Sequence, residues 1–206
     1  MMIQLALDRM TIEEAIDIAA AAGKHIDWIE VGTSLIKEFG MESVRSMKAA
    51  FPNKVIVADM KTNDNAHYEC RMCFQAGADV ATVMGTAPLI TIEACIAEAE
   101  KNGKHIMIDL LNTNPIQQEA LSRYNAILCL HTGKDEQELG TGKRNKSALQ
   151  AGLKRAVAGG ITVENLPAYK KINPDVFIIG SAITKADDPA QAAAAFKQQL
   201  KKEETR

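Results

Sequence analysis

The chain has almost no net charge, no long hydrophobic run and few cysteines, and each shortage excludes a class of protein. The formal net charge of the 206 residues is -2, which argues against a surface that binds nucleic acid or an anionic membrane. No apolar run is long enough to cross a bilayer. The first residues, M-M-I-Q-L-A-L-D, lack the basic start and the long apolar core of a signal peptide. We therefore expect a soluble, cytoplasmic protein.

The four cysteines are Cys70, Cys73, Cys95 and Cys129, and three of them lie in apolar or helical surroundings, as reduced and packed thiols do. His67, Cys70 and Cys73 are spaced by threes, so a helix would align them along one stripe, and both residue types bind zinc. A structural zinc site needs four ligands, and no second Cys/His pair follows nearby. Packing in a core or at an interface is therefore the favoured interpretation.

Short apolar runs alternate with amphipathic stretches along the whole chain. The runs are rich in Val and Ile and are continuous rather than alternating, which is typical of strands that are covered on both faces. The eight expected strands span residues 2–8, 26–32, 55–61, 79–85, 105–111, 126–132, 154–160 and 176–182.

Helical patterns fill the intervals between these runs. The first helix begins after Thr11, which has Glu14 three residues later and so predicts a capping box. Further helices are expected over residues 35–50, 65–76, 88–101, from 115, 145–152, 162–171 and 189–201, with a frayed tail at 202–206. Eight strand–helix units predict one domain over residues 1–206, a single (β/α)8 TIM barrel. A doubly wound open sheet is the competing fold, but it usually has fewer strands.

Charged residues interrupt the third run, V-I-V-A-D-M-K-T-N-D at residues 55–64. A buried strand that suddenly carries Asp59, Lys61 and Asp64 forms either an ion-pair network or a site, because unpaired buried charges cost several kcal/mol each. The alternative is a strand end whose charges are simply solvated. The rest of the chain favours a site.

Ionisable residues end five of the first six expected strands, and catalytic groups of a TIM barrel lie at these ends. The strand-end residues are Asp8, Glu30, Asp59 with Lys61, Asp109, and His131. Glu30 and Asp59 come from different strands and could share a divalent cation such as Mg²⁺. Asp8 could be a structural partner of Lys61.

Two of these residues suggest a reaction that passes through an enediolate. Lys61 could stabilise an enediolate oxygen. His131 could move a proton near neutral pH, with a hydrogen-bonded core histidine as the alternative.

The last two strands end in small residues, A-G-G at 158–160 and G-S-A at 180–182. Gly159, Gly160, Gly180 and Ser181 would let backbone N–H groups approach a phosphate beside helix N-termini. Glycine is also an ordinary turn residue, but its presence after both strands favours a phosphate site. The residues thus predict a phosphorylated small substrate.

Residues 59–64, D-M-K-T-N-D, match the D-x-K-x-x-D motif of the orotidine 5'-monophosphate decarboxylase superfamily. Matches also occur at L-A-L-D (5–8), I-E-V-G-T (29–33), G-A-D (77–79), V-A-G-G-I (157–161) and I-G-S-A-I (179–183). Together they resemble the sugar-phosphate branch of that superfamily, which holds 3-hexulose-6-phosphate synthase and 3-keto-L-gulonate-6-phosphate decarboxylase, over nearly the whole chain.

The resemblance implies a homodimer in which Asp64 reaches into the neighbour's site. It implies Mg²⁺ near Glu30 and Asp59, and substrate contacts from Asp8 and Lys61. It also implies phosphate contacts from the two glycine loops. His67 stands where the synthase has small residues, so it could enter the site.

Residues 130–133, L-H-T-G, followed by Asp135, resemble the synthase, as does Asp109. The implied reaction adds formaldehyde to D-ribulose 5-phosphate through an enediolate, or reverses that addition. The alternative is the decarboxylase, which has arginines around the histidine; here Thr132 and Lys134 stand at those positions. A third alternative is a non-catalytic phosphosugar-binding barrel, but folding alone does not require the charged motif.

Overall fold

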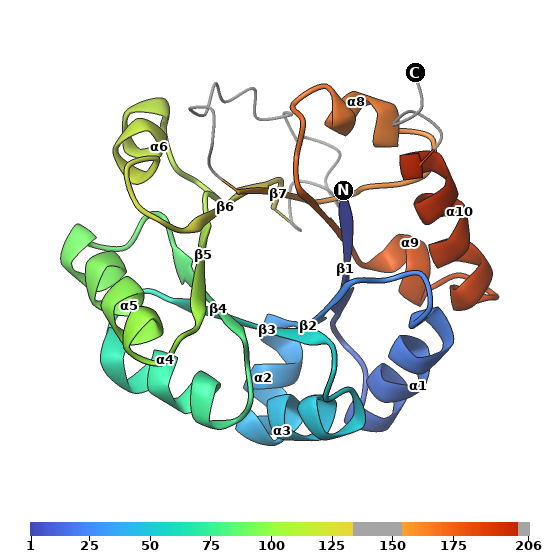
Figure 1. Cartoon of the computed structure of the whole chain (residues 1–206), viewed down its shortest axis with the longest axis horizontal. Helices are drawn as coiled ribbons and strands as arrows, with labels where there is room; N and C mark the ends of the chain where they lie inside the picture. Colours follow the sequence, from blue (N-terminus) through green and yellow to red (C-terminus); the bar gives the residue numbers. More distant parts are fainter. Residues whose placement is uncertain (134–153, 202–206) are drawn as a thin grey trace.

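The structure, a computed structural model, describes residues 1–133 and 154–201, and in these ranges the chain forms one closed barrel (Figure 1). All eight strands are parallel and neighbour one another in chain order, with β8 pairing back to β1. The expected (β/α)8 barrel is therefore confirmed. Lys134, the expected helix over 145–152 and the tail over 202–206 lie outside the described residues.

Every expected strand is present within a few residues of its predicted bounds. The strands are β1 (Met2–Leu7), β2 (Trp28–Val31), β3 (Val55–Thr62), β4 (Val80–Met84), β5 (His105–Asp109), β6 (Ile127–His131), β7 (Arg155–Ala158) and β8 (Val176–Ile179).

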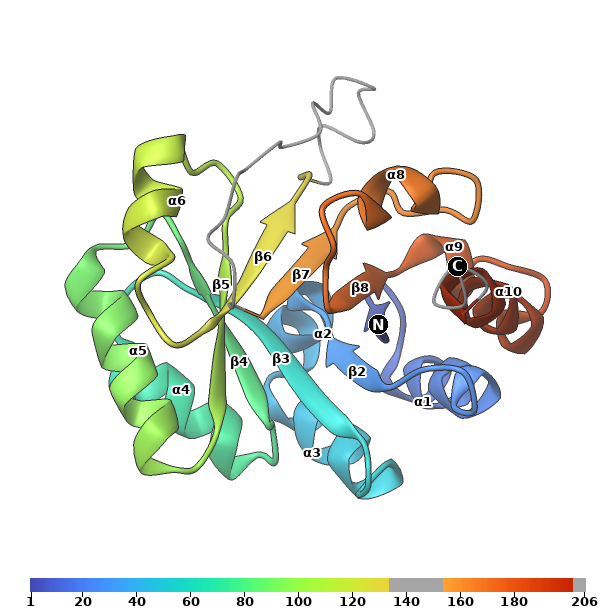
Figure 2. The ribbon, with the colours of Figure 1, turned by 45° about the horizontal axis from the view of Figure 1, so that its top comes forward.

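The described helices lie around the outside of this barrel, and α10 packs beside α1 (Figure 2). They are α1 (Ile12–Ala22), α2 (Thr33–Phe39), α3 (Met41–Ala50), α4 (Ala66–Gln75), α5 (Leu89–Lys101), α6 (Pro115–Leu121), α8 (Leu166–Lys170), α9 (Ser181–Thr184) and α10 (Pro189–Lys201). The capping box before α1 is confirmed, since Thr11 Oγ1 accepts from the Glu14 amide and the Glu14 carboxylate accepts from the Thr11 amide.

One helix prediction was wrong, and one short helix was missed. The single helix expected over 35–50 is two helices, because Gly40 adopts φ +61° between α2 and α3 and ends the first of them. The short helix α9, directly after β8, was not predicted at all. Its four residues carry too little sequence for a periodic pattern to appear.

Side chains alternate across each strand, which creates two apolar layers and directs the site residues inward. The residues Leu5, Ile29 and Ile56 are fully buried between the strands and the helices. Val57 and Val80 belong to a second cluster inside the barrel. Because alternation has a period of two, Asp59 follows Val57 to the inside.

The cysteines are all buried free thiols. Cys70, Cys73 and Cys95 belong to the layer between sheet and helices, and Cys129 lies inside the barrel. Packing is therefore confirmed. Among residues 1–133 and 154–201, no helix is long and apolar enough to span a membrane.

Candidate active site

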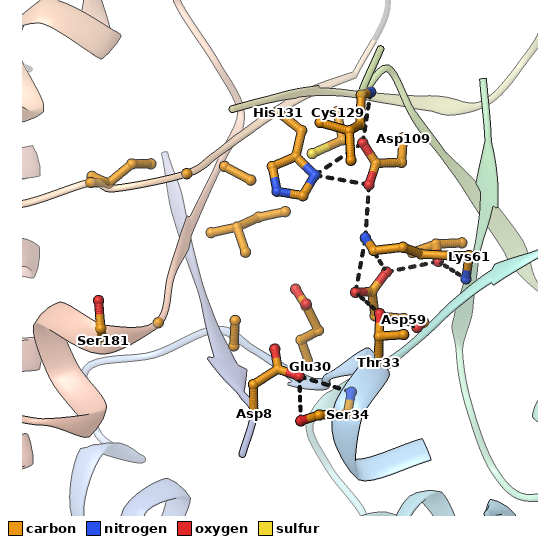
Figure 3. Close-up of a pocket in the computed structure, with 18 of the residues that line it drawn as sticks. Asp8, Glu30, Thr33, Ser34, Asp59, Lys61, Asp109, Cys129, His131 and Ser181 are labelled. Carbon is orange, nitrogen blue, oxygen red and sulfur yellow. Dashed lines mark hydrogen bonds and ion pairs between the residues drawn. The ribbon is translucent and has the colours of Figure 1, made fainter. Parts of the chain in front are cut away.

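A cavity of about 520 Å³ opens where the strands reach their C-terminal ends (Figure 3). This volume suits a small organic ligand. With the exception of Asp64, every residue predicted for the site lines it: Asp8, Glu30, Asp59, Lys61, Asp109, His131, Gly159, Gly160, Gly180 and Ser181. Barrel closure brings together residues that are far apart in the sequence.

The last half of β3 departs from regular strand geometry and thereby presents Lys61. Ala58 pairs with Ala81, but the next pair is Thr62 with Val83, so β3 has two more residues than β4 between these pairs. Lys61 adopts φ +52° within this bulge. Bulges redirect side chains and are frequent beside active sites.

Lys61 connects two carboxylates from different strands. Its Nζ lies 2.8 Å from Asp109 Oδ2 and 3.1 Å from Asp59 Oδ1. Burial opposes the charged ammonium, but the two carboxylates outweigh that effect and raise the pKa of Lys61. The lysine is therefore a fixed cation at neutral pH and can stabilise a developing oxyanion.

Asp109 also orients His131. The Nδ1 atom of His131 lies 2.9 Å and 3.1 Å from the two carboxylate oxygens of Asp109. Burial alone would raise the pKa of Asp109, but the hydrogen bond from His131 and the charges of His131 and Lys61 lower it below its usual range. The ionised carboxylate of Asp109 accepts a hydrogen bond from Nδ1–H of His131, which fixes the tautomer in which Nε2 can act as a base.

The carboxyl group of Glu30 differs from that of Asp109, because its pKa is raised rather than lowered. Its Oε2 accepts from Gln4 Nε2, and the other amide atom of that fully buried glutamine, Oε1, has no hydrogen-bond partner among the described residues. Burial, with repulsion from Asp59, raises the pKa of Glu30 to about 8. A group of three or more metal-ligating side chains is not found in the described part of the chain.

The pair of Glu30 and Asp59 nevertheless fits Mg²⁺. This ion commonly takes one or two protein carboxylates and completes its shell with water and substrate oxygens. The repulsion that raises the pKa of Glu30 is the kind of strain that a bound cation relieves. The donor set is also all oxygen, as a hard cation prefers.

Asp8 does not pair with Lys61, and that expectation was wrong. Its Oδ1 accepts from the amide of Ser34 at 3.0 Å and from Ser34 Oγ at 2.7 Å. Lys61 is held by Asp59 and Asp109 instead. Asp8 therefore lies at the mouth of the cavity with its carboxylate fixed by the start of α2.

The residues that follow β7 and β8 form the opposite wall. Ser181 lies across the cavity from Lys61 and Asp109 (Figure 3). Gly159 has φ +105°, and a Cβ there would approach the Thr132 carbonyl oxygen to 2.3 Å, so this turn requires glycine. Tyr169 fixes the turn by donating its hydroxyl proton to the Gly159 carbonyl at 2.8 Å. The cavity thus has a charged wall and a wall of small residues.

Comparison with known proteins agrees with this arrangement. Residues 1–196 match the family described as orotidine 5'-phosphate decarboxylase / HUMPS. The chain belongs to this family. The expected superfamily is therefore confirmed.

The similar members of the family described next are two kinds of enzyme, a synthase and a decarboxylase. The 3-hexulose-6-phosphate synthase of Bacillus subtilis is 36% identical, over 96% of this chain and 98% of that protein. The crystal structure of 3-hexulose-6-phosphate synthase from Salmonella typhimurium has a TM-score of 0.91 and 36% identity, over 97% of this chain and 98% of that one.

The crystal structure of 3-keto-L-gulonate-6-phosphate decarboxylase from Vibrio cholerae has a TM-score of 0.85 and 32% identity, over 98% of this chain and 97% of that one. The expected resemblance to the sugar-phosphate branch is thus confirmed. So is the expectation of an enzyme of the aldehyde-lyase type, which rests on the relatives named as synthases.

Asp64, which was predicted for the site, and His67, which was considered as a possible addition to it, both lie apart from the cavity. Asp64 is exposed, and its Oδ1 accepts from the Asn65 amide at 2.8 Å. His67 does not enter the cavity within this chain, because its Nδ1 lies 3.1 Å from Glu98 Oε2 on α5. Its side chain is 64% exposed.

Three hydroxyl residues that hold carboxylates of the cavity were not predicted. Thr33 and Thr82 donate to opposite oxygens of Asp59, at 2.6 Å and 2.9 Å, and Ser34 holds Asp8. The prediction considered charged strand ends and glycines, and β4 ends in neither a charge nor a histidine. Alternation along β4 was the available signal, since it places Thr82 beside Val80 on the inner face.

The raised pKa of Glu30 predicts a pH dependence of cation binding. A divalent cation that bound Glu30 and Asp59, with Mn²⁺ as the probe, would have to displace the Glu30 proton below pH 8. Its apparent affinity should then rise up to about tenfold per pH unit from pH 6.5 and level off above 8. Titration calorimetry of the substrate-free protein, in buffers with different ionisation enthalpies, should show release of close to one proton at pH 7. In Glu30→Gln the affinity should be weaker and independent of pH. A wild-type affinity that is constant over this range would contradict the assignment.

Proposed function

We propose that the chain is a magnesium-dependent aldolase that adds formaldehyde to D-ribulose 5-phosphate, giving a 3-hexulose 6-phosphate, and that also catalyses the reverse cleavage. The observation that carries this proposal is the connected group of Lys61, Asp109 and His131 on one wall of the cavity. It combines a fixed cation with an oriented base. The synthase names of the relatives support the same reaction.

The two walls suggest how the substrate lies. Its phosphate would bind the small residues after β7 and β8, where backbone N–H groups can approach closely. Its carbonyl end would then face Lys61 and Asp109 across the cavity. This orientation keeps the dianion away from the carboxylates of Asp59 and Asp109.

The chemistry begins with proton removal. His131 Nε2 takes a proton from C1 of the substrate, and the electron pair of the broken C–H bond forms an enediolate with the C2 carbonyl. Lys61 stabilises the negative oxygen. The electron pair of the enediolate double bond then joins C1 to the carbon of formaldehyde as the C2 carbonyl re-forms. The formaldehyde oxygen takes up the proton held by His131, which restores the base. The formaldehyde carbon becomes C1 of the hexulose, and the carbonyl group becomes C3.

Asp109 has two tasks in this scheme. It keeps the Nδ1 proton on His131, so that Nε2 faces the substrate, and it stabilises the imidazolium that forms when the proton is taken. It also fixes Lys61 Nζ at 2.8 Å. One carboxylate therefore sets the relative positions of the base and the cation.

Glu30 and Asp59 would hold Mg²⁺. When bound, the ion supplies a positive charge that polarises substrate oxygens. Thr33 and Thr82 hold the Asp59 carboxylate from both sides, which limits its rotation.

A product assay tests the proposal. Ribulose 5-phosphate, ¹³C-formaldehyde and Mg²⁺ should give a labelled hydroxymethyl resonance at C1 of a hexulose 6-phosphate. Failure with these substrates, combined with release of carbon dioxide from 3-keto-L-gulonate 6-phosphate, would assign the decarboxylase instead. Sugar-phosphate binding in a thermal shift assay without any turnover would indicate a non-catalytic barrel.

We further propose that the protein is a homodimer in the cytoplasm, with sites shared between subunits. Asp64 belongs to the motif of Asp59 and Lys61 but is exposed on the outside of its own cavity. Near it, α4 and α5 pack together and carry large exposed apolar side chains, with Tyr68 65%, Leu89 51% and Ile90 76% exposed. Such a surface fits burial against a second copy, which would bring Asp64 to the neighbour's substrate.

A further inference from the structure

The strand β4 contains no charged residue and no histidine, yet one of its side chains contacts the centre of the site. Thr82 lies midway along β4, is 3% exposed and lines the cavity. The strand ends Val83-Met84-Gly85, without a charged residue. A threonine at such a position needs a hydrogen-bond partner, because a buried hydroxyl without one is costly.

The hydroxyl group of Thr82 makes two hydrogen bonds. Its Oγ1 accepts from the backbone amide of Lys61 at 2.8 Å and donates to Asp59 Oδ1 at 2.9 Å. The first contact provides the Lys61 amide with an acceptor inside the β3 bulge, where the pairing register with β4 shifts. The second fixes one oxygen of the carboxylate that faces Lys61 Nζ.

These contacts join the unusual backbone to the reacting groups. The backbone of Lys61 adopts φ +52°, which residues other than glycine rarely adopt. Contacts with the surrounding structure must therefore maintain this conformation. Thr33 donates to the other Asp59 oxygen, Oδ2, and to the Asp59 carbonyl, but no hydrogen bond between Thr33 and Lys61 is found in the described residues. The Thr82 hydroxyl therefore connects the backbone of Lys61 with the side chain of Asp59.

We propose that Thr82 is a positioning residue, whose single hydroxyl holds the bulged backbone of Lys61 and the carboxylate of Asp59 in their working geometry. The inference rests on the proposed function for its kinetic consequences, because Lys61 and Asp59 matter there as cation and ligand. Its geometric part, the orientation of Asp59, is independent of which reaction the enzyme catalyses.

Two substitutions separate the hydroxyl from the shape of the side chain. Thr82→Val keeps the branched shape and removes the hydroxyl, whereas Thr82→Ser keeps the hydroxyl and removes a methyl group. Small displacements of catalytic groups can cost about 10²-fold in rate. We expect Thr82→Val to lower kcat about 10–100-fold with KM changed less than about threefold, and Thr82→Ser to stay within about threefold of wild type.

A buried threonine elsewhere provides the control. Thr91 lies on α5, is 7% exposed and does not line the cavity. Thr91→Val should leave kcat unchanged, and its melting temperature calibrates the cost of a buried Thr-to-Val change. If Thr82→Ser lost as much kcat as Thr82→Val, or if Thr82→Val retained wild-type kcat, the proposal would be overturned.

Mn²⁺ binding provides a readout that does not require turnover. Residues that orient metal ligands typically contribute 10–100-fold to affinity, so we expect Thr82→Val to weaken Mn²⁺ binding about tenfold in electron paramagnetic resonance titrations. Thr82→Ser should bind as wild type does. If the wild type lacked aldol turnover, the proposed function would fail, and this titration would still decide the case: equal affinity in Thr82→Val and wild type would refute the role of Thr82.

Discussion

Replacing Lys61 with methionine is expected to lower kcat by about 10³-fold or more, because removal of one donor to a developing oxyanion costs about 10²–10³-fold and this donor also carries a full charge. The loss should appear in kcat more than in KM, since the oxyanion exists only after proton removal. Steady-state kinetics with ribulose 5-phosphate and formaldehyde measures both constants.

Lys104→Met is the matched control for this change. The Lys104 side chain is 27% exposed, as is that of Lys61, and its Nζ lies 2.7 Å from Asp79 Oδ1. Lys104 does not line the cavity. Both variants remove a paired lysine of the same exposure; Lys61→Met breaks two ion pairs and Lys104→Met breaks one, but only Lys61→Met should lose activity. Equal kcat in Lys61→Met and Lys104→Met would remove Lys61 from the mechanism.

Mixing two inactive variants is expected to restore activity if Asp64 acts in the neighbour's site. After subunit exchange between Lys61→Met and Asp64→Ala, half of the dimers are mixed and each has one intact site, so about a quarter of wild-type activity should return. Each variant alone should show only residual turnover. The activity of mixtures prepared by refolding the two proteins together is the measurement.

A second mixture of variants shows whether the recovery of activity depends on active sites that are shared between subunits. Asp59 and Lys61 belong to the same barrel, since the two side chains contact each other. Asp59→Asn mixed with Lys61→Met therefore leaves no intact site in any dimer and should stay inactive. If verified exchange of Lys61→Met with Asp64→Ala restored nothing, the site would not be shared as proposed.

The barrel was predictable because its strands are continuous apolar runs and its helices have their own period. The exception was the stretch over 35–50, where one glycine, Gly40, adopts a backbone conformation that ends α2. Periodicity does not detect such a break, because apolar residues continue at helical spacing on both sides. The short α9 offers less than two turns of pattern.

The residues of the cavity were predictable for a geometric reason, since barrel closure gathers the strand ends whatever their separation in sequence. Their ion-pair partners were not predictable from the sequence. Asp8 was expected to pair with Lys61, but Lys61 contacts Asp109, 48 residues further along the chain. Which strand-end groups touch depends on stagger and on the bulge in β3, and neither is encoded in a pattern of single residues.

Uncharged residues that hold charged ones were the hardest to predict. Thr82 and Gln4 stand at inward positions of β4 and β1, but threonine and glutamine in a strand carry no signal of their own. Their roles follow only from the atoms they contact, Asp59 Oδ1 for Thr82 and Glu30 Oε2 for Gln4.

Deuterium exchange at C1 of ribulose 5-phosphate, followed by proton NMR in deuterium oxide with Mg²⁺ and without formaldehyde, tests the central claim most directly. The wild type should exchange a C1 proton, because His131 and Lys61 form the enediolate before the electrophile arrives. His131→Gln should slow this exchange by about 10²–10⁴-fold, the usual contribution of a positioned base. The absence of exchange in the wild type, or unchanged exchange in His131→Gln, would contradict the account.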